Sequence, residues 1–346
     1  MMKSSYSRRG FVRTSSAALA AGATGVALIG CGGEATDSGR TRVDFLAILS
    51  PEGLTFAPEL LAISGGYFAD HGLEVTMQPT RGSAPAIQSV IAGGAPLTRI
   101  EQIEGVIHLA NREVPIRNVG TVIKESAIRF VSSTSAPIRE PEDFTGKLIG
   151  IPSEGGSSDL TLDLVLSAAG IEPGSVERQV IGVGANNYDL VERGTIHTYA
   201  VSIDVANILA RQRDTVVVFN PGDFITSGAQ FYMVSEDGLE QHRDTVRRYL
   251  EAVGAAIDFM IDDDGFDRTL ETMRSRYSFA TLEDTAIAKA SLAEYVRIWT
   301  AEGRDNILRT VSQSWQQGYD ELVRSGLAEP GRDPAAWFTN ELVPTR

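Results

Sequence analysis

The sequence is poor in the side chains that cross-link a chain or bind metals. It holds one cysteine and four histidines in 346 residues. One cysteine excludes an internal disulfide framework, and so few thiols make a Cys/His zinc cluster unexpected. The histidines are scattered, and no His-x-x-x-His or Glu-x-x-His spacing occurs. We therefore predict neither a metal site nor a cofactor.

Positive charge and nucleophile motifs are also scarce. Lys and Arg together number 31 against 45 Asp and Glu, which gives a net charge of −14. Phosphate contacts need a basic face, so the charge argues against nucleic acid as a partner. No Gly-x-Ser-x-Gly nucleophile elbow is present, and no catalytic residue is predicted. The apolar fraction of 42% and the length are typical of a globular protein with two domains or one large one.

The N-terminal thirty residues contain basic residues and no acid, followed by a mildly apolar stretch rich in Ala and Gly. The run from Ser7 to Arg13, Ser-Arg-Arg-Gly-Phe-Val-Arg, resembles the twin-arginine export motif. The run that ends at Cys31, Leu-Ile-Gly-Cys, resembles a bacterial lipobox. We expect residues 1–30 to be a twin-arginine lipoprotein signal peptide and Cys31 to be the lipidation site. The alternative is an incidental cysteine in an ordinary cleaved signal.

Residues 31–41 are polar and rich in Gly, which predicts a flexible tether. Without the signal peptide, 27 basic and 45 acidic residues remain, a net charge of −18. We therefore expect an extracytoplasmic protein that a lipid on Cys31 anchors to a bacterial membrane, in the periplasm or at the cell surface.

The rest of the chain alternates apolar runs of strand length with stretches of helical spacing. Strands are expected at 43–49, 72–77, 119–123, 128–132, 147–151, 178–183, 198–202, 215–219 and 230–234. Helices are expected at 55–69, 84–92, 157–169, 187–193, 239–262, 266–276, 283–302 and 305–325. This alternation predicts an α/β fold with mainly parallel sheets covered by helices. Crossings at 132–137 and 220–227 would make 42–132 plus 226–346 one lobe (lobe I) and 133–225 an inserted lobe (lobe II).

Three segments carry a family resemblance. Residues 56–75, with Ala-Pro-Glu, Gly-Tyr-Phe and Gly-Leu-Glu-Val in order, are similar to the opening of ABC-transporter solute-binding proteins. The branch is the one for nitrate, alkylsulfonates and thiamine-type pyrimidines. Residues 141–150, Pro-Glu-Asp-Phe-Thr-Gly-Lys-Leu-Ile-Gly, resemble that family's entry to the second lobe. Residues 164–171 resemble one of its helix ends, and the resemblance covers roughly 43–270.

The resemblance implies a two-lobed periplasmic binding protein type II fold with a ligand cleft between the lobes. It also implies a monomer that closes on a small polar or anionic solute, pyrimidine-like or sulfonate/nitrate-like, and delivers it to an ABC permease and its ATPase. Two departures leave the solute open. Pro96 stands near one Asp of the family pattern, and His197 or Thr198 stands at another. The alternatives are a ligand-sensing lipoprotein with another membrane partner and an exported enzyme on the same scaffold.

Candidate ligand-binding residues are those at predicted helix starts, where free N–H groups and polar side chains meet. Ser50 and Thr55 precede the first helix and Ser83 precedes the second. The Gly-rich loop of the inserted lobe offers Glu154, Gly156, Ser157 and Ser158. Asn187 and Tyr188 begin a further helix. For each of these the alternative is a cap that contacts only its own helix.

Four further candidates lie near strand ends. Arg99 could grip a carboxylate, sulfonate or phosphate, and Glu101 could accept from an amine or pyrimidine. The alternative is that Arg99 and Glu101 form a surface ion pair. Gln102 follows them, and Asp204 occupies the place where the resembled family offers a side chain to the cleft. Tyr295, at helical spacing with Trp299, is expected to pack against lobe I.

Overall fold

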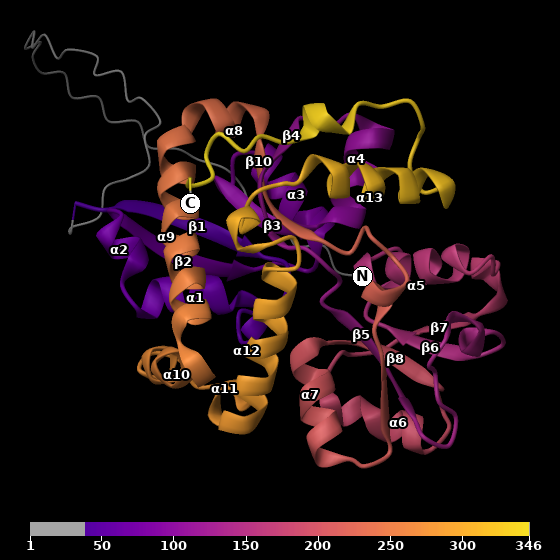
Figure 1. The fold of residues 1–346 in the computed structure, drawn as a ribbon. Helices are drawn as coiled ribbons and strands as arrows, with labels where there is room; N and C mark the ends of the chain where they lie inside the picture. Colours follow the sequence, from indigo (N-terminus) through magenta and orange to yellow (C-terminus); the bar gives the residue numbers. More distant parts are fainter. Residues whose placement is uncertain (1–38, 346) are drawn as a thin grey trace, which may run out of the picture. The chain divides into compact units, whose positions relative to one another are not determined.

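Two five-stranded sheets organise the chain in the computed structural model, which describes residues 39–345 (Figure 1). The predicted signal peptide, Cys31 and most of the tether lie outside the described residues. The first sheet has the order β2-β1-β3-β10-β4: β1 Thr41–Ala47, β2 Leu73–Pro79, β3 Leu97–Glu101, β4 Ile116–Ile123 and β10 Gln230–Ser235. The second has the order β7-β6-β8-β5-β9: β5 Ile128–Ser133, β6 Leu148–Ile151, β7 Glu177–Val180, β8 Thr198–Ser202 and β9 Val216–Phe219.

Each sheet contains one strand that runs against its neighbours. β1 pairs in parallel with β2 and β3, whereas β10 is antiparallel to β3 and β4. β6 pairs in parallel with β7 and β8, whereas β5 is antiparallel to β8 and β9. β5 and β10 are the strands by which the chain enters the second sheet and returns to the first. The expectation of mainly parallel sheets flanked by helices is therefore confirmed.

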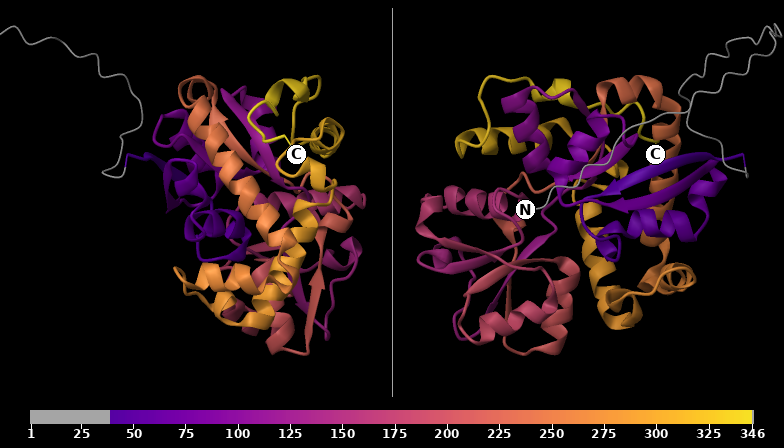
Figure 2. Two further views of the ribbon diagram at one scale, coloured as in Figure 1. Left: turned by 60° about the vertical axis from the view of Figure 1, so that its left-hand side comes forward. Right: turned by 180° about the vertical axis from the view of Figure 1, so that it is seen from behind.

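Helices fill the connections between strands and cover the sheets (Figures 1 and 2). Those before the second sheet are α1 Ala57–Ser64, α2 Tyr67–Asp70, α3 Ser83–Ile91 and α4 Gln102–Arg112. Those within the second sheet's segment are α5 Ser157–Ala168, α6 Tyr188–Glu192 and α7 Ile203–Gln212. The C-terminal ones are α8 Glu236–Gln241, α9 Arg243–Asp262, α10 Asp267–Arg274, α11 Ala280–Glu283, α12 Thr285–Trp299 and α13 Ser312–Arg324. α12 packs against α7 and β4, so it joins elements of both sheets (Figure 2).

The structure corrects several element predictions. β3 and α7 were not predicted, and the helix expected over 239–262 is divided into α8 and α9. The helix expected over 55–69 is interrupted at Gly66, whose φ of 81° is left-handed, so α1 and α2 are separate helices. The helix expected to start at 305 starts at Ser312, because the preceding segment pairs with β4: the Thr121 N–H donates to the Leu308 carbonyl at 2.8 Å. α4 was not predicted, although Ile103, Val106 and Ala110 have helical spacing and are buried.

The apolar core of the first sheet centres on an aromatic cluster. Phe45 on β1 stacks on Tyr249 of α9, with ring centroids 5.7 Å apart. Tyr232 on β10 meets Tyr249 edge-on at 5.6 Å, and Phe56 meets Phe45 edge-on at 6.4 Å. All four side chains are fully buried. The cluster therefore connects β1 and β10, the two neighbours of the central strand β3, to α9 and to the start of α1, because burying paired aromatic rings stabilises the contact between the elements that carry them.

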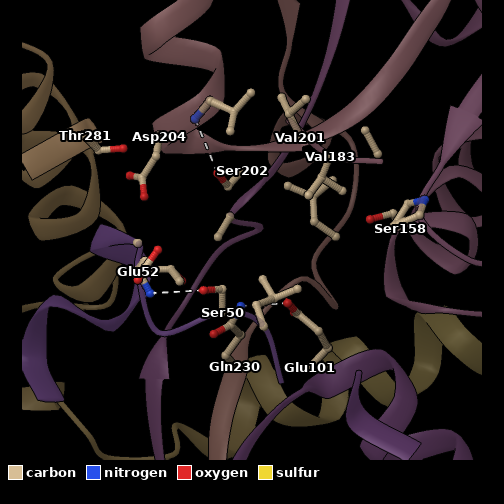
Figure 3. A pocket seen from close by; sticks show the side chains of 18 of the residues that line it. Ser50, Glu52, Glu101, Ser158, Val183, Val201, Ser202, Asp204, Gln230 and Thr281 are labelled. Atoms are coloured by element: carbon tan, nitrogen blue, oxygen red, sulfur yellow. Dashed lines mark hydrogen bonds between the residues drawn. The ribbon is translucent and has the colours of Figure 1, made fainter. Parts of the chain in front are cut away.

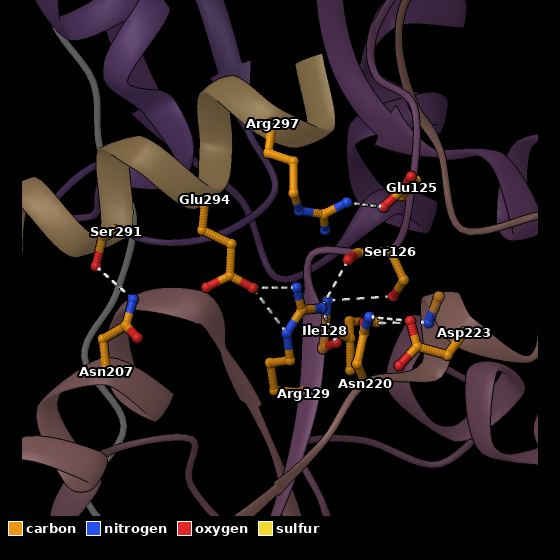
Figure 4. Close-up of polar contacts among 11 residues, drawn as sticks. Glu125, Ser126, Ile128, Arg129, Asn207, Asn220, Asp223, Ser291, Glu294 and Arg297 are labelled. Atoms are coloured by element: carbon orange, nitrogen blue, oxygen red, sulfur yellow. Dashed lines mark hydrogen bonds and ion pairs between the residues drawn. The ribbon is translucent and has the colours of Figure 1, made fainter. Parts of the chain in front are cut away.

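The two segments that cross between the sheets lie against each other. A Cβ added at Gly228 would lie 2.7–2.8 Å from the Cβ, Cα and N atoms of Ser126. Beside this contact, the guanidinium of Arg129 donates from Nη1 to the carbonyls of Ser126 and Ile128, both at 2.8 Å (Figure 4). Arg129 Nε also donates to Glu294 of α12 at 3.1 Å. The crossing is thus tightly packed and tied to α12.

We expect Gly228→Ala to lower the free energy of unfolding by about 1–3 kcal/mol, because the new methyl group would overlap backbone atoms of the other crossing segment. Gly174→Ala is the control, since a Cβ there meets no atom within 4 Å. Chemical denaturation of both variants measures the difference. Equal stability of the two variants would contradict the close approach at Ser126.

Candidate functional site

A cavity of about 260 Å³ is lined by residues from both sheets (Figure 3). Its walls come from the segments that follow β1, β6 and β7, from the ends of β3 and β8, from the start of β10, and from α5, α7, α11 and α12. Its lining residues are Leu49, Ser50, Glu52, Gly53, Thr55, Glu101, Ala127, Ile128, Pro152, Ser158, Val183, Ala200, Val201, Ser202, Asp204, Val205, Gln230, Thr281 and Tyr295. The carboxyl ends of parallel strands are where ligands bind in open α/β sheets. The position and size of the cavity suit a small molecule.

Asp204 lies at the start of α7 and is 4% exposed. Its Oδ2 accepts a hydrogen bond from the Leu54 N–H at 2.7 Å, so a helix of the second sheet contacts the helical turn that leads into α1. Its Oδ1 has no hydrogen-bond partner. Burial raises the pKa of Asp204 to about 7, against the opposing effects of the Leu54 N–H and of the nearby Ser291 and Tyr295 hydroxyls.

Glu101 and Gln230 form a second polar pair in the cavity wall. They are register partners on the antiparallel strands β3 and β10, and Gln230 Nε2 donates to Glu101 Oε1 at 2.6 Å. Burial and the negative charge of Glu104 raise the pKa of Glu101 to about 8. Glu101 is therefore mostly protonated at neutral pH and can donate a hydrogen bond. Gln230 Oε1 has no hydrogen-bond partner.

The cavity lining contains acidic side chains but no basic ones among the described residues. Its ionisable carboxyls are Glu52, Glu101 and Asp204, and no Lys or Arg is among the described residues that line it. Most of the wall is apolar, and Leu49 and Val183 are 48% and 41% exposed at the cavity. Tyr295 adds a buried hydroxyl without a hydrogen-bond partner. The cavity thus offers hydrogen-bond acceptors between apolar walls.

Five of the residues proposed from the sequence line this cavity: Ser50, Thr55, Glu101, Ser158 and Asp204. Eight do not: Ser83, Arg99, Gln102, Glu154, Gly156, Ser157, Asn187 and Tyr188. No ligand is present, so contact with a solute stays a prediction for the first group. The second group lies elsewhere for identifiable reasons.

Arg99 lies within β3, fully buried, and faces the core of the first sheet. Its Nη1 bonds both carboxylate oxygens of Glu59 at 3.0 and 3.1 Å, and its Nη2 donates to the Thr55 carbonyl at 2.7 Å. Tyr232 Oη donates to Glu59 at 2.7 Å, and the guanidinium lies 4.5 Å from the Phe56 ring centroid. Burial alone would lower the pKa of Arg99, but the Glu59 carboxylate raises it, so the guanidinium stays charged. Arg99, predicted to grip an anionic ligand, does not line the cavity, and the alternative of a surface ion pair with Glu101 is not formed either, since its partner is Glu59.

The inserted segment's candidates mostly serve packing or capping. Ser157 Oγ donates to Glu104 Oε2 at 2.6 Å, which links α5 to α4 of the other sheet. Tyr188 is buried in the core of the second sheet, where its hydroxyl lies 3.3 Å from the Ser132 carbonyl. Asn187 Nδ2 donates to the Gly182 carbonyl at 2.7 Å. Glu154 is exposed in the loop before α5, and Gly156 is the N-cap of that helix.

The remaining two candidates belong to the first sheet. Ser83 is buried as the first residue of α3, and its hydroxyl has no hydrogen-bond partner. Gln102 packs against Gly318 of α13, where an added Cβ would lie 2.4 Å from Gln102 Nε2. It lines a separate small hollow of about 20 Å³ next to Lys124. Neither reaches the main cavity.

Sequence reasoning missed several lining residues, above all Gln230 and Tyr295. Gln230 was assigned to a strand, but its place beside Glu101 depends on the antiparallel return of β10. Tyr295 was expected only to pack. It is fully buried and stacks near Trp299 at 6.1 Å, but it also lines the cavity. Its helical spacing gave no signal for this second contact.

Within the described residues, 39–345, no group of three or more His, Cys, Asp or Glu residues is arranged to hold a metal ion. No helix in the same range is long and apolar enough to span a membrane.

Comparison with known proteins gives one family match. Residues 54–264, more than half of the chain, match the family model described as NMT1/THI5 like. The riboflavin-binding protein RibY of Chloroflexus aurantiacus is 26% identical over 318 residues, which cover 86% of this chain and 85% of RibY. The formylaminopyrimidine-binding protein of Halalkalibacterium halodurans is 23% identical over 208 residues, 59% of this chain and 62% of that protein.

Solved structures show the same fold. The alkanesulfonate-binding protein SsuA of Xanthomonas axonopodis pv. citri, bound to MOPS, superposes with a TM-score of 0.65. Its identity is 13%, and the match covers 86% of this chain and 98% of SsuA. The periplasmic binding protein fold expected from the sequence is therefore confirmed.

We expect Arg99→Met to cost about 3–5 kcal/mol of unfolding free energy, because it leaves the Glu59 carboxylate buried without its counter-charge. Combining it with Glu59→Gln removes that uncompensated charge, so the double variant is expected to lose less than the single one. Arg247→Met, at an exposed pair with Asp244, is the control and should cost under about 1 kcal/mol. Urea denaturation measures all three, and a single variant no less stable than the control would refute the assignment.

The stability of the protein should depend on pH through Glu101. In the folded state the Glu101 carboxyl keeps its proton up to about pH 8, whereas an unperturbed Glu loses its proton near pH 4.5. The resulting stabilisation is present below about pH 4.5 and is lost as the pH rises through about 8, by up to about 1.4 kcal/mol per pH unit. Glu101→Gln cannot titrate, so its free energy of unfolding should fall less between pH 5 and pH 8. Identical slopes for the two proteins would show that Glu101 is not buried as described.

Proposed function

The chain belongs to the NMT1/THI5-like family, and we propose that it is an extracytoplasmic solute-binding protein that delivers a small solute to an ABC importer. The observation that carries the proposal is the cavity between the two sheets. Three buried polar atoms without hydrogen-bond partners belong to its lining residues: Asp204 Oδ1, Gln230 Oε1 and the Tyr295 hydroxyl. Buried polar atoms are normally satisfied, so a polar solute is the natural partner for such a group.

The lining favours a nitrogen heterocycle over an anion among the two solute classes expected from the sequence. A sulfonate or nitrate needs donors or positive charge, and the described lining residues include carboxyls but no Lys or Arg. A flat ring suits the apolar walls, and its ring N–H groups suit the free acceptors. The relatives named for riboflavin and for formylaminopyrimidine support this class.

Capture would proceed by closure of two lobes. The boundary expected between residues 132 and 133 lies too late, because β5, Ile128–Ser133, belongs to the second sheet, so lobe II would begin just before β5 and end before β10. The two crossing segments at Ser126 and Gly228 are the natural hinge, because the backbone there is the only covalent link between the sheets. Closure buries the solute, and differential contacts in the closed state are what a transporter can read.

Export and anchoring complete the proposal. Residues 1–30 would direct twin-arginine export, Cys31 would carry the lipid, and residues 31–41 would tether the binding lobes to the membrane. The partners would be the solute, an ABC permease and its ATPase, with the binding protein acting as a monomer.

A thermal-shift panel on the purified protein tests the binding function, with riboflavin, uracil, MOPS and nitrate as probes. A bound probe at 100 times its Kd adds about 2.7 kcal/mol to the stability of the folded state, which raises Tm by several degrees. We expect a shift with a ring probe and none with MOPS or nitrate. A shift only with the anions would overturn the solute class, and a flat panel would count against solute capture.

The two alternative functions give different results. A ligand-sensing lipoprotein would bind a ring probe but would not support its uptake in vesicles that contain the permease and ATPase. An exported enzyme would convert the probe, so chromatography of the bound probe after release would recover a product. Recovery of the intact probe together with uptake supports the importer role.

A further inference from the structure

Asp204 contacts the first lobe with one carboxylate oxygen and leaves the other free. Oδ2 accepts from the Leu54 N–H across the interface between the lobes, 150 residues away in sequence. Ser202 caps α7 instead, accepting from the Val205 N–H at 3.3 Å. The carboxylate of Asp204 is therefore not used to cap its own helix. It bridges the two lobes.

The second oxygen of Asp204 belongs to a side chain that lines the cavity. Oδ1 is itself buried and has no hydrogen-bond partner, and Asp204 lies next to the loop that carries Glu52 (Figure 3). An unsatisfied buried acceptor disfavours the closed, empty protein. A donor placed against Oδ1 removes that penalty, so it stabilises the closed arrangement in which Oδ2 bonds Leu54.

We propose that Asp204 is a specificity-determining residue that selects solutes with an N–H donor and couples their binding to lobe closure. This inference rests on the proposed function and extends it. The solute is a small, flat, neutral or cationic ring whose N–H donates to Asp204 Oδ1, whereas a solute with acceptors alone would oppose the carboxylate. Glu52 also lines the cavity, and no Lys or Arg among the described lining residues offsets its charge, which adds to the discrimination against anions.

Asp204→Asn separates the two roles within one side chain. The Asn carbonyl can still accept from Leu54, while its amide replaces the free acceptor by a donor toward the cavity. Asp204→Ala removes both. Ser157→Ala is the matched control, because it deletes the Ser157–Glu104 hydrogen bond between the lobes and Ser157 does not line the cavity.

The first measurement needs no solute. Hydrogen exchange of the Leu54 amide reports the bond between the lobes. We expect protection in the wild type, Asp204→Asn and Ser157→Ala, and faster exchange in Asp204→Ala. Equal exchange in Asp204→Ala and the wild type would overturn the coupling, whatever the protein binds.

The second measurement uses calorimetric titration with uracil, 1,3-dimethyluracil and riboflavin. We expect uracil or riboflavin to bind the wild type and Ser157→Ala alike and to bind Asp204→Asn at least about 10-fold more weakly. Dimethyluracil, which has no N–H, should bind more weakly than uracil. Unchanged affinity in Asp204→Asn, or equal affinity for the methylated ring, would overturn donor selection while leaving solute binding intact. Absence of binding by every probe in the wild type would overturn this inference together with the ring class.

Discussion

The buried ion pair of Arg99 and Glu59 is the constraint on which the first lobe depends. Removing two charges from water is costly, and their attraction and hydrogen bonds must offset that cost. Here the guanidinium donates hydrogen bonds to both Glu59 oxygens and to the Thr55 carbonyl, and the Tyr232 hydroxyl donates a further hydrogen bond to the Glu59 carboxylate. Because these groups come from β3, α1, the turn before α1 and β10, satisfying one pair of charges fixes four elements relative to one another.

That fixed arrangement positions the cavity. The Thr55 carbonyl is bonded to Arg99, and one residue earlier the Leu54 N–H points to Asp204 of the other lobe. The rigid interior of lobe I thereby positions a backbone N–H, that of Leu54, to donate across the interface to Asp204. The opposite wall follows from topology, since the antiparallel return of β10 sets Gln230 beside Glu101 at the carboxyl end of β3. A charge pair that does not line the cavity thus helps to determine where the cavity-lining groups lie.

The fold could be predicted from local patterns, and much of the site could not. Strand-length apolar runs and the three family-like segments were enough for the two mainly parallel sheets. Glu101 was proposed because it lies near the end of a strand, and Asp204 because the resembled family offers a side chain to the cleft at that place. Arg99 was misplaced because nothing near it in the sequence reveals a partner 40 residues away at Glu59. Gln230 was missed because it lies beside Glu101 only through the pairing of β10 with β3, and the two residues are 129 positions apart in the sequence.

The strand order of the first sheet also governs the sequence of events in which the chain can fold. In that sheet β4 pairs with β10. β10 begins 107 residues after β4 ends, and the whole second sheet lies between them in the sequence. The second sheet, by contrast, is one continuous segment, so its contacts can form while β4 still has an open edge. Pairing across such distances is slow, and an unpaired edge invites association with other chains. The topology therefore lets the inserted lobe form from one continuous segment, whereas the sheet of the first lobe is complete only when β10 has joined it.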